Sequence, residues 1–429
     1  MSARTLAQWL EFIGRQHPDA IALGLERVHA VLGRMDVRIA CPVFTVAGTN
    51  GKGSICALLE RILQASGRRV GLYTSPHLLR YNERVRLSLR EADDDALCAA
   101  FAAVEAARGD VPLTYFEFGT LAALGLFARA APDVLVLEVG LGGRLDAVNA
   151  IDADCAILSS IDLDHAEYLG TSRESVGREK AGILRAGRPA VVADPHPPDT
   201  VFAEAGRIGA EVLLFGRDFG YRAHAGQWDY WGPGGRRSAL AYPALRGARQ
   251  LRNAAAALAA LDAMHEALPV SMQDVRRGLA EVELPARFQV LPGRPTTILD
   301  VAHNAEAARA LAENLGNAGF SPETIAVFGM LRDKDVGAVV AAVAPRITRW
   351  HLASLEGPRG ASAGELARTL RGAGVTAPIA EHDCPAAAFV AAQGEAGEND
   401  KIVAFGSFLT VAEVMRSLST PADGPGRHG

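Results

Sequence analysis

Length, composition and charge describe a globular chain with room for more than one domain. The 429 residues are 49% hydrophobic and 22% charged, and the formal net charge is −5. These proportions are ordinary for globular proteins, and a chain of this length can form two or three domains with their own cores. A mildly acidic balance does not favour general nucleic-acid binding, so we expect no nucleic-acid partner.

The cysteines and the N-terminal residues argue against secretion and against a membrane span. The five cysteines are scattered and form no Cys-x-x-Cys pair, which fits reduced thiols better than a disulfide framework or a zinc site. They are Cys41, Cys56, Cys98, Cys155 and Cys384. Residues 1–11 lack the apolar core of a signal peptide, and no apolar run approaches the roughly 20 residues that cross a bilayer. We therefore expect a cytoplasmic protein without a membrane partner.

A glycine-rich stretch at residues 45–54 is the most informative part of the chain. Residues 42–46 predict a buried strand, and residues 55–63 carry apolar side chains at helical spacing. Three glycines and Lys52 therefore lie on a strand-to-helix turn, where backbone N–H groups and a helix N-terminus can hold an anion. This pattern predicts a triphosphate-binding loop. Its candidate ATP ligands are Asn50, Gly51, Lys52, Gly53 and Ser54.

The loop departs from the common nucleotide-binding pattern at two positions. Val46 stands where that pattern has glycine, and Gly53 stands where a serine or threonine usually follows the lysine. A glycine-rich turn with an incidental lysine is the alternative, but the flanking strand and helix favour phosphate binding. The missing hydroxyl beside Lys52 implies that magnesium is held partly by other residues.

The remainder of the first two-thirds of the chain alternates between strands and helices. Strands are expected at 70–73, 83–89, 134–139 and 155–161, and helices within 5–35, at about 93–107 and at about 117–130. Such alternation predicts an α/β fold with a mostly parallel sheet covered on both faces. Ligands of these sheets bind at the carboxyl ends of the strands. Ser75, Glu138 and His165 follow such ends, as the glycine-rich loop does, so we expect them to converge.

The last third of the chain predicts a second, smaller α/β domain. Residues 218–245 predict a small β insertion, followed by a helix over Asn253–His265 and another from about Met272. The cluster at 292–295 predicts a linker, which we also expect to act as a hinge. The first domain would then span 1–291 and the second 296–419, with strands at 297–300, 325–329 and 401–406 and a disordered tail at 420–429.

Several charged residues offer candidate chemistry, each with an ordinary alternative. Glu138 ends an apolar strand, so a metal ion or Lys52 would offset the cost of burying its charge; the alternative is a salt bridge to Arg144. His165 lies beside two aspartates but is an unusual ligand for magnesium, which prefers oxygen. Lys180 reads from the residues alone as a lysine on a helix surface.

The turn at 300–304 places Asp300, His303 and Asn304 between a strand and a helix. Such a cluster suits contacts to a polar ligand or a phosphate, and simple N-capping by Asn304 is the alternative. Arg287 could reach a nucleotide; otherwise it is a surface arginine.

The ordered series of motifs resembles the folylpolyglutamate synthase/dihydrofolate synthase family, relatives of the Mur peptide ligases. The resemblance runs nearly end to end. It rests on residues 48–54, 74–78, 138–147, 163–165 with 169–170, 178–182, 300–304 and 329–335.

The resemblance implies a two-domain ligase with an N-terminal ATP-binding domain and a Rossmann-like C-terminal domain. It implies that Ser75, Glu138 and His165 hold magnesium, with two ions in all, and that Lys180 is carbamylated. It places Asn253, Arg287 and Asp300 on ATP. The implied pterin-binding residues are Ala22, Leu23, Gly24, Leu25, Thr114, Tyr115, Phe116, Glu117, Leu145, Asp146 and Ala147.

The implied activity is ATP-dependent addition of L-glutamate to dihydropteroate and to reduced folates through an acyl phosphate. In this reaction Lys52 would offset phosphoryl charge, His303 would orient or deprotonate the incoming amine, and a monomer is expected. Three motifs depart from the family: Ala305-Glu306 replaces Pro-His, Ala286 replaces glycine and Leu409 replaces histidine. A monofunctional folylpolyglutamate synthase, a Mur-type cell-wall ligase and a nucleotide-binding switch protein are the alternatives.

Overall fold

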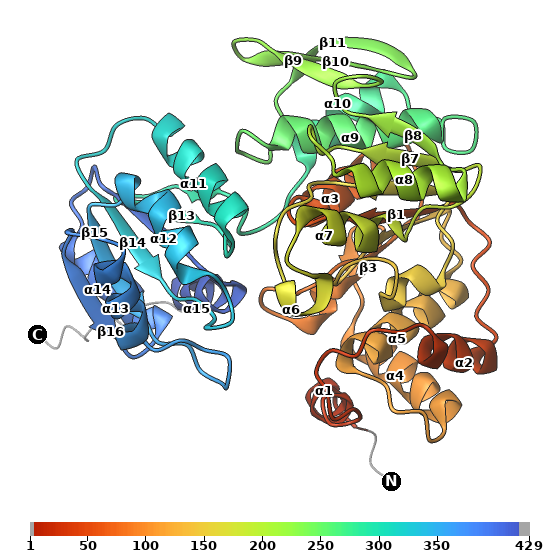
Figure 1. Cartoon of the computed structure of the whole chain (residues 1–429), viewed down its shortest axis with the longest axis horizontal. Coiled ribbons are helices and arrows are strands. Elements are labelled where there is room, and N and C mark those ends of the chain that lie inside the picture. Colours follow the sequence, from red (N-terminus) through yellow and green to blue (C-terminus); the bar gives the residue numbers. More distant parts are fainter. Residues whose placement is uncertain (1–3, 420–429) are drawn as a thin grey trace, which may run out of the picture. The chain divides into compact units, whose positions relative to one another are not determined.

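The computed structural model describes residues 4–419 and divides into two compact units. The first unit comprises the residues up to 244 together with 249–283, and the second comprises 245–248 together with the residues from 284 onward. Figure 1 gives the elements of both units. The tail expected at 420–429 lies outside the described residues. No helix between residues 4 and 419 combines the length and apolarity that crossing a bilayer requires.

The first unit is built on an eight-stranded sheet with the order β4-β3-β2-β5-β1-β6-β7-β8. The strands are β1 (Val43–Ala47), β2 (Val70–Tyr73), β3 (Val85–Leu87), β4 (Arg90–Glu91), β5 (Val134–Glu138), β6 (Cys155–Leu158), β7 (Pro189–Val192) and β8 (Glu211–Leu214). The pairs β2–β3 and β3–β4 are antiparallel, and the other pairs of this sheet are parallel. The parallel pairs β2–β5, β5–β1 and β1–β6 bring the carboxyl ends of four strands to one edge, as the sequence predicted.

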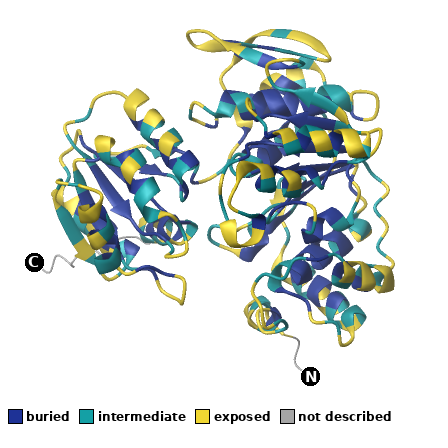
Figure 2. Cartoon of the chain, in the orientation of Figure 1, coloured by how far each residue is buried: buried dark blue, intermediate teal, exposed yellow. Residues whose placement is uncertain are grey.

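Helices cover both faces of this sheet, which explains why its central strands are apolar throughout. All five residues of β1 are buried, and Figure 2 shows the strands dark blue beneath partly exposed helices. One face shares a core with α1 (Leu6–Ile13), α2 (Glu26–Met35), α4 (Asp94–Arg108), α5 (Tyr115–Ala130), α7 (Arg173–Ala181) and α8 (Asp199–Ile208). The helices α3 (Lys52–Ala65), α9 (Gln250–Ala263) and α10 (Met272–Glu281) pack together, with α3 against β1, β2 and β5. Short helices are η1 (Tyr81–Arg84), η2 (Ala147–Ala150) and α6 (Ala166–Leu169).

The expected β insertion is a separate three-stranded sheet of the first unit. It consists of β9 (Gly220–Ala223), β10 (Gln227–Gly232) and β11 (Gly235–Ala241), all antiparallel. Trp228 and Tyr230 are buried beneath it. The Tyr230 hydroxyl donates to Asp262 Oδ2 on α9 at 2.6 Å, and Arg237 pairs with Asp262 Oδ1 at 2.5 Å, so the small sheet is anchored on α9.

The second unit contains a six-stranded sheet with the order β12-β13-β17-β14-β15-β16. The strands are β12 (Gln289–Leu291), β13 (Thr296–Leu299), β14 (Thr324–Phe328), β15 (Arg349–Ala353), β16 (Ile379–His382) and β17 (Lys401–Phe405). The helices are α11 (Ala305–Asn317), α12 (Val336–Val343), η3 (Ala344–Arg346), α13 (Ala363–Gly372), α14 (Pro385–Glu395) and α15 (Phe408–Ser419). All pairs except β12–β13 are parallel, which confirms a second α/β domain.

Two local predictions are corrected. The predicted linker at 292–295 is the turn of the β12–β13 hairpin, so it joins two strands of one sheet and cannot be a hinge between the units. The chain crosses between the units at 244/245, 248/249 and 283/284 instead. Proline and glycine favour tight turns as strongly as linkers, so composition alone could not separate the two. The strand predicted at 83–89 is interrupted, because residues up to Arg84 form η1 and only 85–87 form β3.

Candidate active site

The glycine-rich loop connects β1 to α3, as the sequence predicted. Gly48 (φ 152°) and Gly51 (φ 92°) adopt backbone conformations that other residues rarely take. A Cβ at Gly48 would overlap Ser159 Oγ, and one at Gly51 would lie 2.8 Å from Asn253 Oδ1. Both glycines are therefore required by space as well as by conformation.

Hydroxyl groups at the end of β6 hold this loop in place. Ser160 Oγ accepts from Asn50 N at 3.1 Å, and Ser159 Oγ donates to Asn50 O at 2.7 Å. Thr49 Oγ1 donates to Asp162 O at 2.9 Å. The sequence reasoning missed Ser159 and Ser160, which lie within the strand predicted at 155–161 but follow the end of β6 in the structure. Their contacts fix the loop backbone through uncharged groups.

Lys52 begins α3 and folds its side chain back over the loop. Its Nζ donates to Gly48 O at 3.0 Å and to Thr49 O at 3.5 Å. No acidic residue occupies the first turn of α3. The ammonium group and the helix N-terminus therefore both present positive charge on the loop, which is the arrangement that binds phosphate.

Asn253 lies next to the loop and is connected to it through Gln250. Asn253 Nδ2 donates to Gln250 Oε1 at 3.0 Å, and Gln250 Nε2 donates to Ser54 Oγ at 3.3 Å. Both residues lie on α9, three positions apart, so one helix face carries both amides. The structure thus joins the predicted ATP residues Ser54 and Asn253. Gln250 was not predicted, and its helical spacing from Asn253 was the available signal.

Glu138 and Ser75 meet at the ends of β5 and β2. Glu138 is 5% exposed and its Oε2 accepts from Ser75 N at 3.2 Å. Arg144 pairs with Glu179 at 2.8 Å, so the salt bridge considered for Glu138 is instead made with a different carboxylate. Two predicted metal ligands are therefore in direct contact.

His165 follows β6, the strand on the other side of β1. It has a left-handed backbone (φ 50°), and its Nε2 lies 3.9 Å from Asp164 Oδ2. A serine hydroxyl and a carboxylate offer the oxygen atoms that magnesium prefers, and an imidazole offers a nitrogen. Within residues 4–419 no three His, Cys, Asp or Glu side chains gather into a metal site.

Lys180 is buried rather than on a helix surface, which corrects the reading from the residues alone. It lies on α7 and is 3% exposed. The sequence pattern missed this because α7 is covered on more than one side. It packs against α8, and Gly143, in the loop that follows β5, lies close to the backbone carbonyls of Glu179 and Lys180.

The three segments expected to contact a pterin lie together although they are far apart in sequence. Gly24 N donates to Leu145 O at 3.3 Å. Arg27 Nη2 donates to Glu117 Oε1 at 2.8 Å and to Ala22 O at 2.6 Å, so it joins the first segment to the second. The Glu117 carboxylate also accepts from Thr114 N at 2.8 Å within a helix capping box. Glu117 is therefore occupied in holding the segments together.

Asp146 organises the third segment. Its Oδ2 accepts from Leu141 N at 2.8 Å and its Oδ1 accepts from Val148 N at 3.0 Å. Burial raises the pKa of Asp146 to about 6, although these backbone N–H groups oppose the shift. Phe116 approaches the same loop, because a Cβ on Gly140 would lie 2.6 Å from its ring.

The second unit carries its own polar cluster at the β13–α11 turn. Asp300 accepts from Phe288 N at 2.9 Å and from Ala302 N at 2.8 Å, and burial raises its pKa to about 6 against the opposing charge of Arg287. Arg287 is half-buried and stacks over the Phe408 ring at 5.3 Å.

His303 and Asn304 complete this cluster. His303 Nδ1 lies 2.8 Å from Val301 O, so that nitrogen carries the proton and Nε2 is the basic one. The centres of the His303 and Phe408 rings lie 6.1 Å apart. Phe408 was not predicted from the sequence. Asn304 Oδ1 accepts from Ala307 N at 2.9 Å, so the capping alternative holds for this residue.

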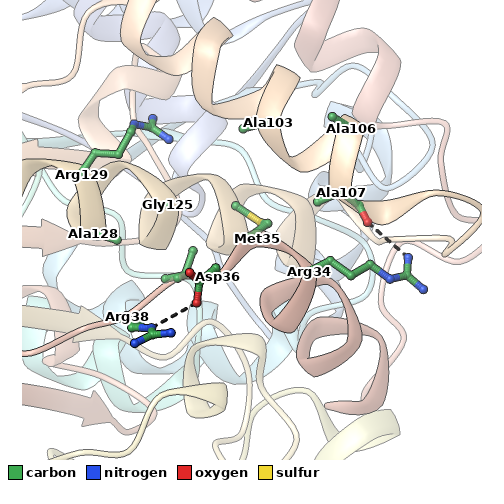
Figure 3. A pocket seen from close by; sticks show the side chains of 11 residues that line it. Arg34, Met35, Asp36, Arg38, Ala103, Ala106, Ala107, Gly125, Ala128 and Arg129 are labelled. Carbon is green, nitrogen blue, oxygen red and sulfur yellow. Dashed lines mark hydrogen bonds and ion pairs between the residues drawn. The ribbon is translucent and has the colours of Figure 1, made fainter.

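A separate cavity of about 660 Å³ lies among α2, α4 and α5 of the first unit. Arginines and small side chains line it, and Figure 3 shows Arg34, Arg38 and Arg129 pointing in different directions around Met35. It contains none of the predicted site residues, so it is not the candidate active site.

Comparisons with known proteins agree with this arrangement. Residues 46–261 match the Mur ligase middle domain, and residues 286–408 match the Mur ligase, glutamate ligase domain. The chain is 45% identical over 424 residues to the dihydrofolate synthase/folylpolyglutamate synthase of Escherichia coli K12, covering 99% of this chain and 98% of that one.

Solved structures show the same similarity. The E. coli FolC structure in complex with DHPP and ADP matches with a TM-score of 0.93 and 45% identity, over 97% of this chain and 98% of that one. A bifunctional folylpolyglutamate synthase/dihydrofolate synthase with Mn, AMPPNP and L-glutamate bound matches with a TM-score of 0.90 and 45% identity, over the same shares. The chain therefore belongs to the dihydrofolate synthase/folylpolyglutamate synthase family of Mur ligases.

Proposed function

We propose that this protein adds L-glutamate to dihydropteroate, giving dihydrofolate, and to reduced folates, giving polyglutamates, at the expense of ATP. The observation that carries the proposal is the shared edge of the first sheet, where the Lys52 loop, Ser75, Glu138 and the His165 segment follow neighbouring parallel strands. This arrangement matches a site for a metal-bound triphosphate. The pterin-segment contacts through Arg27 and Gly24 support a preformed place for the acid.

The first step activates the acid. A carboxylate oxygen of the acid attacks the γ-phosphorus of ATP, the bond to the β–γ bridging oxygen breaks, and ADP leaves with that electron pair. Lys52 offsets the charge that develops on the transferred phosphoryl group. Asn253, Arg287 and Asp300 hold the nucleotide. The backbone N–H groups of 50–54 bind its phosphates.

Ser75, Glu138 and His165 would hold magnesium, and we propose two ions and a carbamylated Lys180. Bound magnesium supplies Lewis-acid stabilisation of phosphate oxygens. Lys180 is 3% exposed and lies on α7 of the same unit as Ser75 and Glu138, which supports a role inside the site rather than on the surface. Metal analysis of the purified protein with AMPPNP would count the ions.

The second step forms the amide. The amine nitrogen of glutamate attacks the acyl carbon, the bond between that carbon and the phosphate oxygen breaks, and phosphate leaves. The amine must also lose a proton, and we propose that Nε2 of His303 accepts it. The contact of His303 Nδ1 with Val301 O supports this role, because it leaves Nε2 able to accept.

Product analysis tests the proposal directly. The protein is incubated with ATP, magnesium and glutamate, and with dihydropteroate or a reduced folate in separate reactions. We expect each acid to gain the mass of one or more glutamyl residues, with one ADP and one phosphate released per amide. Addition to the folate alone would indicate a monofunctional enzyme, and no glutamate-dependent phosphate release would overturn the proposal. We also propose a monomer, which light scattering would check.

A further inference from the structure

Arg84 is a buried arginine that none of the roles above uses. It is the last residue of η1, and it is 9% exposed. Its backbone carbonyl accepts from Thr74 N at 2.9 Å, which places it against the loop that follows β2. This loop contains Ser75, one of the proposed metal ligands.

The side chain of Arg84 is held by uncharged partners. Its Nε donates to His77 Nδ1 at 2.9 Å. Its guanidinium carbon lies 5.3 Å from the centre of the Tyr81 ring and 5.6 Å from that of Tyr115. These contacts fix the plane of the guanidinium group and leave its two terminal nitrogens as donors.

No carboxylate within residues 4–419 pairs with Arg84. The neighbouring arginines differ, since Arg80 pairs with Glu91 and Arg86 pairs with the buried Glu60. A buried cation without an acidic partner is costly, and stacking on aromatic rings offsets only part of that cost. The fork of a guanidinium group matches a carboxylate, so an anionic ligand would complete the site.

The position of Arg84 indicates which anion this is. On one side, His77 is two residues from Ser75, whose backbone contacts Glu138. On the other side, Tyr115 belongs to the segment proposed to contact the pterin. A substrate that rests its pterin on that segment and is phosphorylated at the metal must place its carboxylate between the two.

We propose that the terminal N–H groups of Arg84 bind the carboxylate of dihydropteroate that becomes phosphorylated. This inference rests on the proposed function. Arg84 acts by holding the carboxylate in the plane set by Tyr81 and Tyr115. Arg84 thus belongs to the acid-binding site, together with the pterin segments.

The test compares dihydropteroate with its decarboxylated analogue, in which a hydrogen replaces the carboxylate. Dissociation constants are measured by fluorescence on the full chain with ADP and magnesium. The wild-type protein should prefer the acid by about ten- to a hundredfold, the value of a charged hydrogen-bonded pair. Arg84→Met keeps the apolar stem of the side chain. In this variant the dissociation constant of the acid should rise while that of the analogue stays the same, so that the ratio of the two comes close to one. Arg80→Met, an exposed arginine of the same segment, should keep the wild-type preference.

The outcomes separate a binding role from a structural one. An Arg84→Met protein that still prefers the acid, or that loses the acid and the analogue equally, would overturn the proposal. If this variant does not fold, Arg84→Lys decides, because it keeps the charge without the fork and should reduce the preference to an intermediate value. An unchanged preference there also overturns it. Failure of the proposed function is distinct, since it would appear as a wild-type protein that makes no glutamylated product.

Discussion

The phosphate loop of the first unit and the Asp300 turn of the second occupy the same position in their sheets but are held by different means. Each follows the carboxyl end of a parallel strand and leads into a helix. Hydroxyl groups of Ser159 and Ser160 hold the first through neutral hydrogen bonds. A buried carboxylate, Asp300, holds the second by accepting from two backbone N–H groups.

Because of this difference, we expect the contacts of the two regions to depend differently on pH. Hydroxyl groups do not titrate in the physiological range, so the hydrogen bonds of Ser159 and Ser160 to Asn50 should not depend on pH. Asp300 has a pKa raised to about 6, because burial outweighs the favourable charge of Arg287. The second region, for which we propose nucleotide binding, therefore contains a carboxyl group whose pKa is raised to about 6.

The largest effect is expected from Lys52→Ala in the first region. Removing the ammonium group takes away its stabilisation of phosphoryl charge, so kcat should fall by about a thousandfold or more. The melting temperature should change little, since the hydrogen bonds that Lys52 Nζ donates within residues 4–419 go to two loop carbonyls. Lys401→Ala is the matched control, because Lys401 Nζ bonds Gly319 O within the second unit and should leave kcat unchanged. An active, folded Lys52→Ala protein would contradict the role given to the loop.

Asp300→Asn tests the titratable region. The folded pKa of about 6 lies above the ordinary value of 3.8, so the folded state holds its proton more tightly. The free energy of unfolding should therefore fall as the pH rises from about 4 to about 6, by on the order of 3 kcal/mol, and level off above. Asp300→Asn should remove this decline.

Hydrogen exchange of β17 amides, measured from pH 4.5 to 7.5, reports the second unit by itself. The matched control is Asp146→Asn, which removes a carboxylate of similar pKa from the first unit and should leave the β17 profile as in the wild type. A decline with pH that persists in the Asp300→Asn protein would show that another group causes it.

The smallest effect is expected from Ser160→Ala. This change leaves Asn50 N without its hydroxyl acceptor, at a cost of about 1 kcal/mol, so KM for ATP should rise about fivefold. The increase should be the same at pH 6 and pH 8, because no charge is involved. Steady-state kinetics at both pH values would check this, with Ser66→Ala at the far end of α3 as the control. If the ratio of the KM of Ser160→Ala to that of the wild type varied with pH, the two regions would not differ in their pH dependence as described.

The sequence predicted the parts of the site that depend on local pattern. Strand, glycine-rich turn and helix follow one another at 43–65, and parallel alternation correctly placed Ser75 and Glu138 at one edge. Burial of Lys180 could not be predicted, because it depends on tertiary packing around α7. The same holds for Arg84, whose aromatic neighbours Tyr81 and Tyr115 come from two separate segments of the chain. The domain boundary was predicted wrongly at 292–295, because proline and glycine are common both in tight turns and in linkers.

Residues 245–248 belong to the second unit although the chain on both sides of them belongs to the first, and this affects how the two units could be expressed separately. These four residues leave the first unit, and Ala248 N donates to Asn314 Oδ1 at 3.0 Å on α11, before the chain returns to the first unit at 249. A fragment that begins at 284 would lack this short loop and leave the Asn314 amide facing solvent. A fragment that ends at 283 would carry the loop without its docking partner. No single cut yields both halves intact, so the halves are better separated by permuting the termini than by truncation.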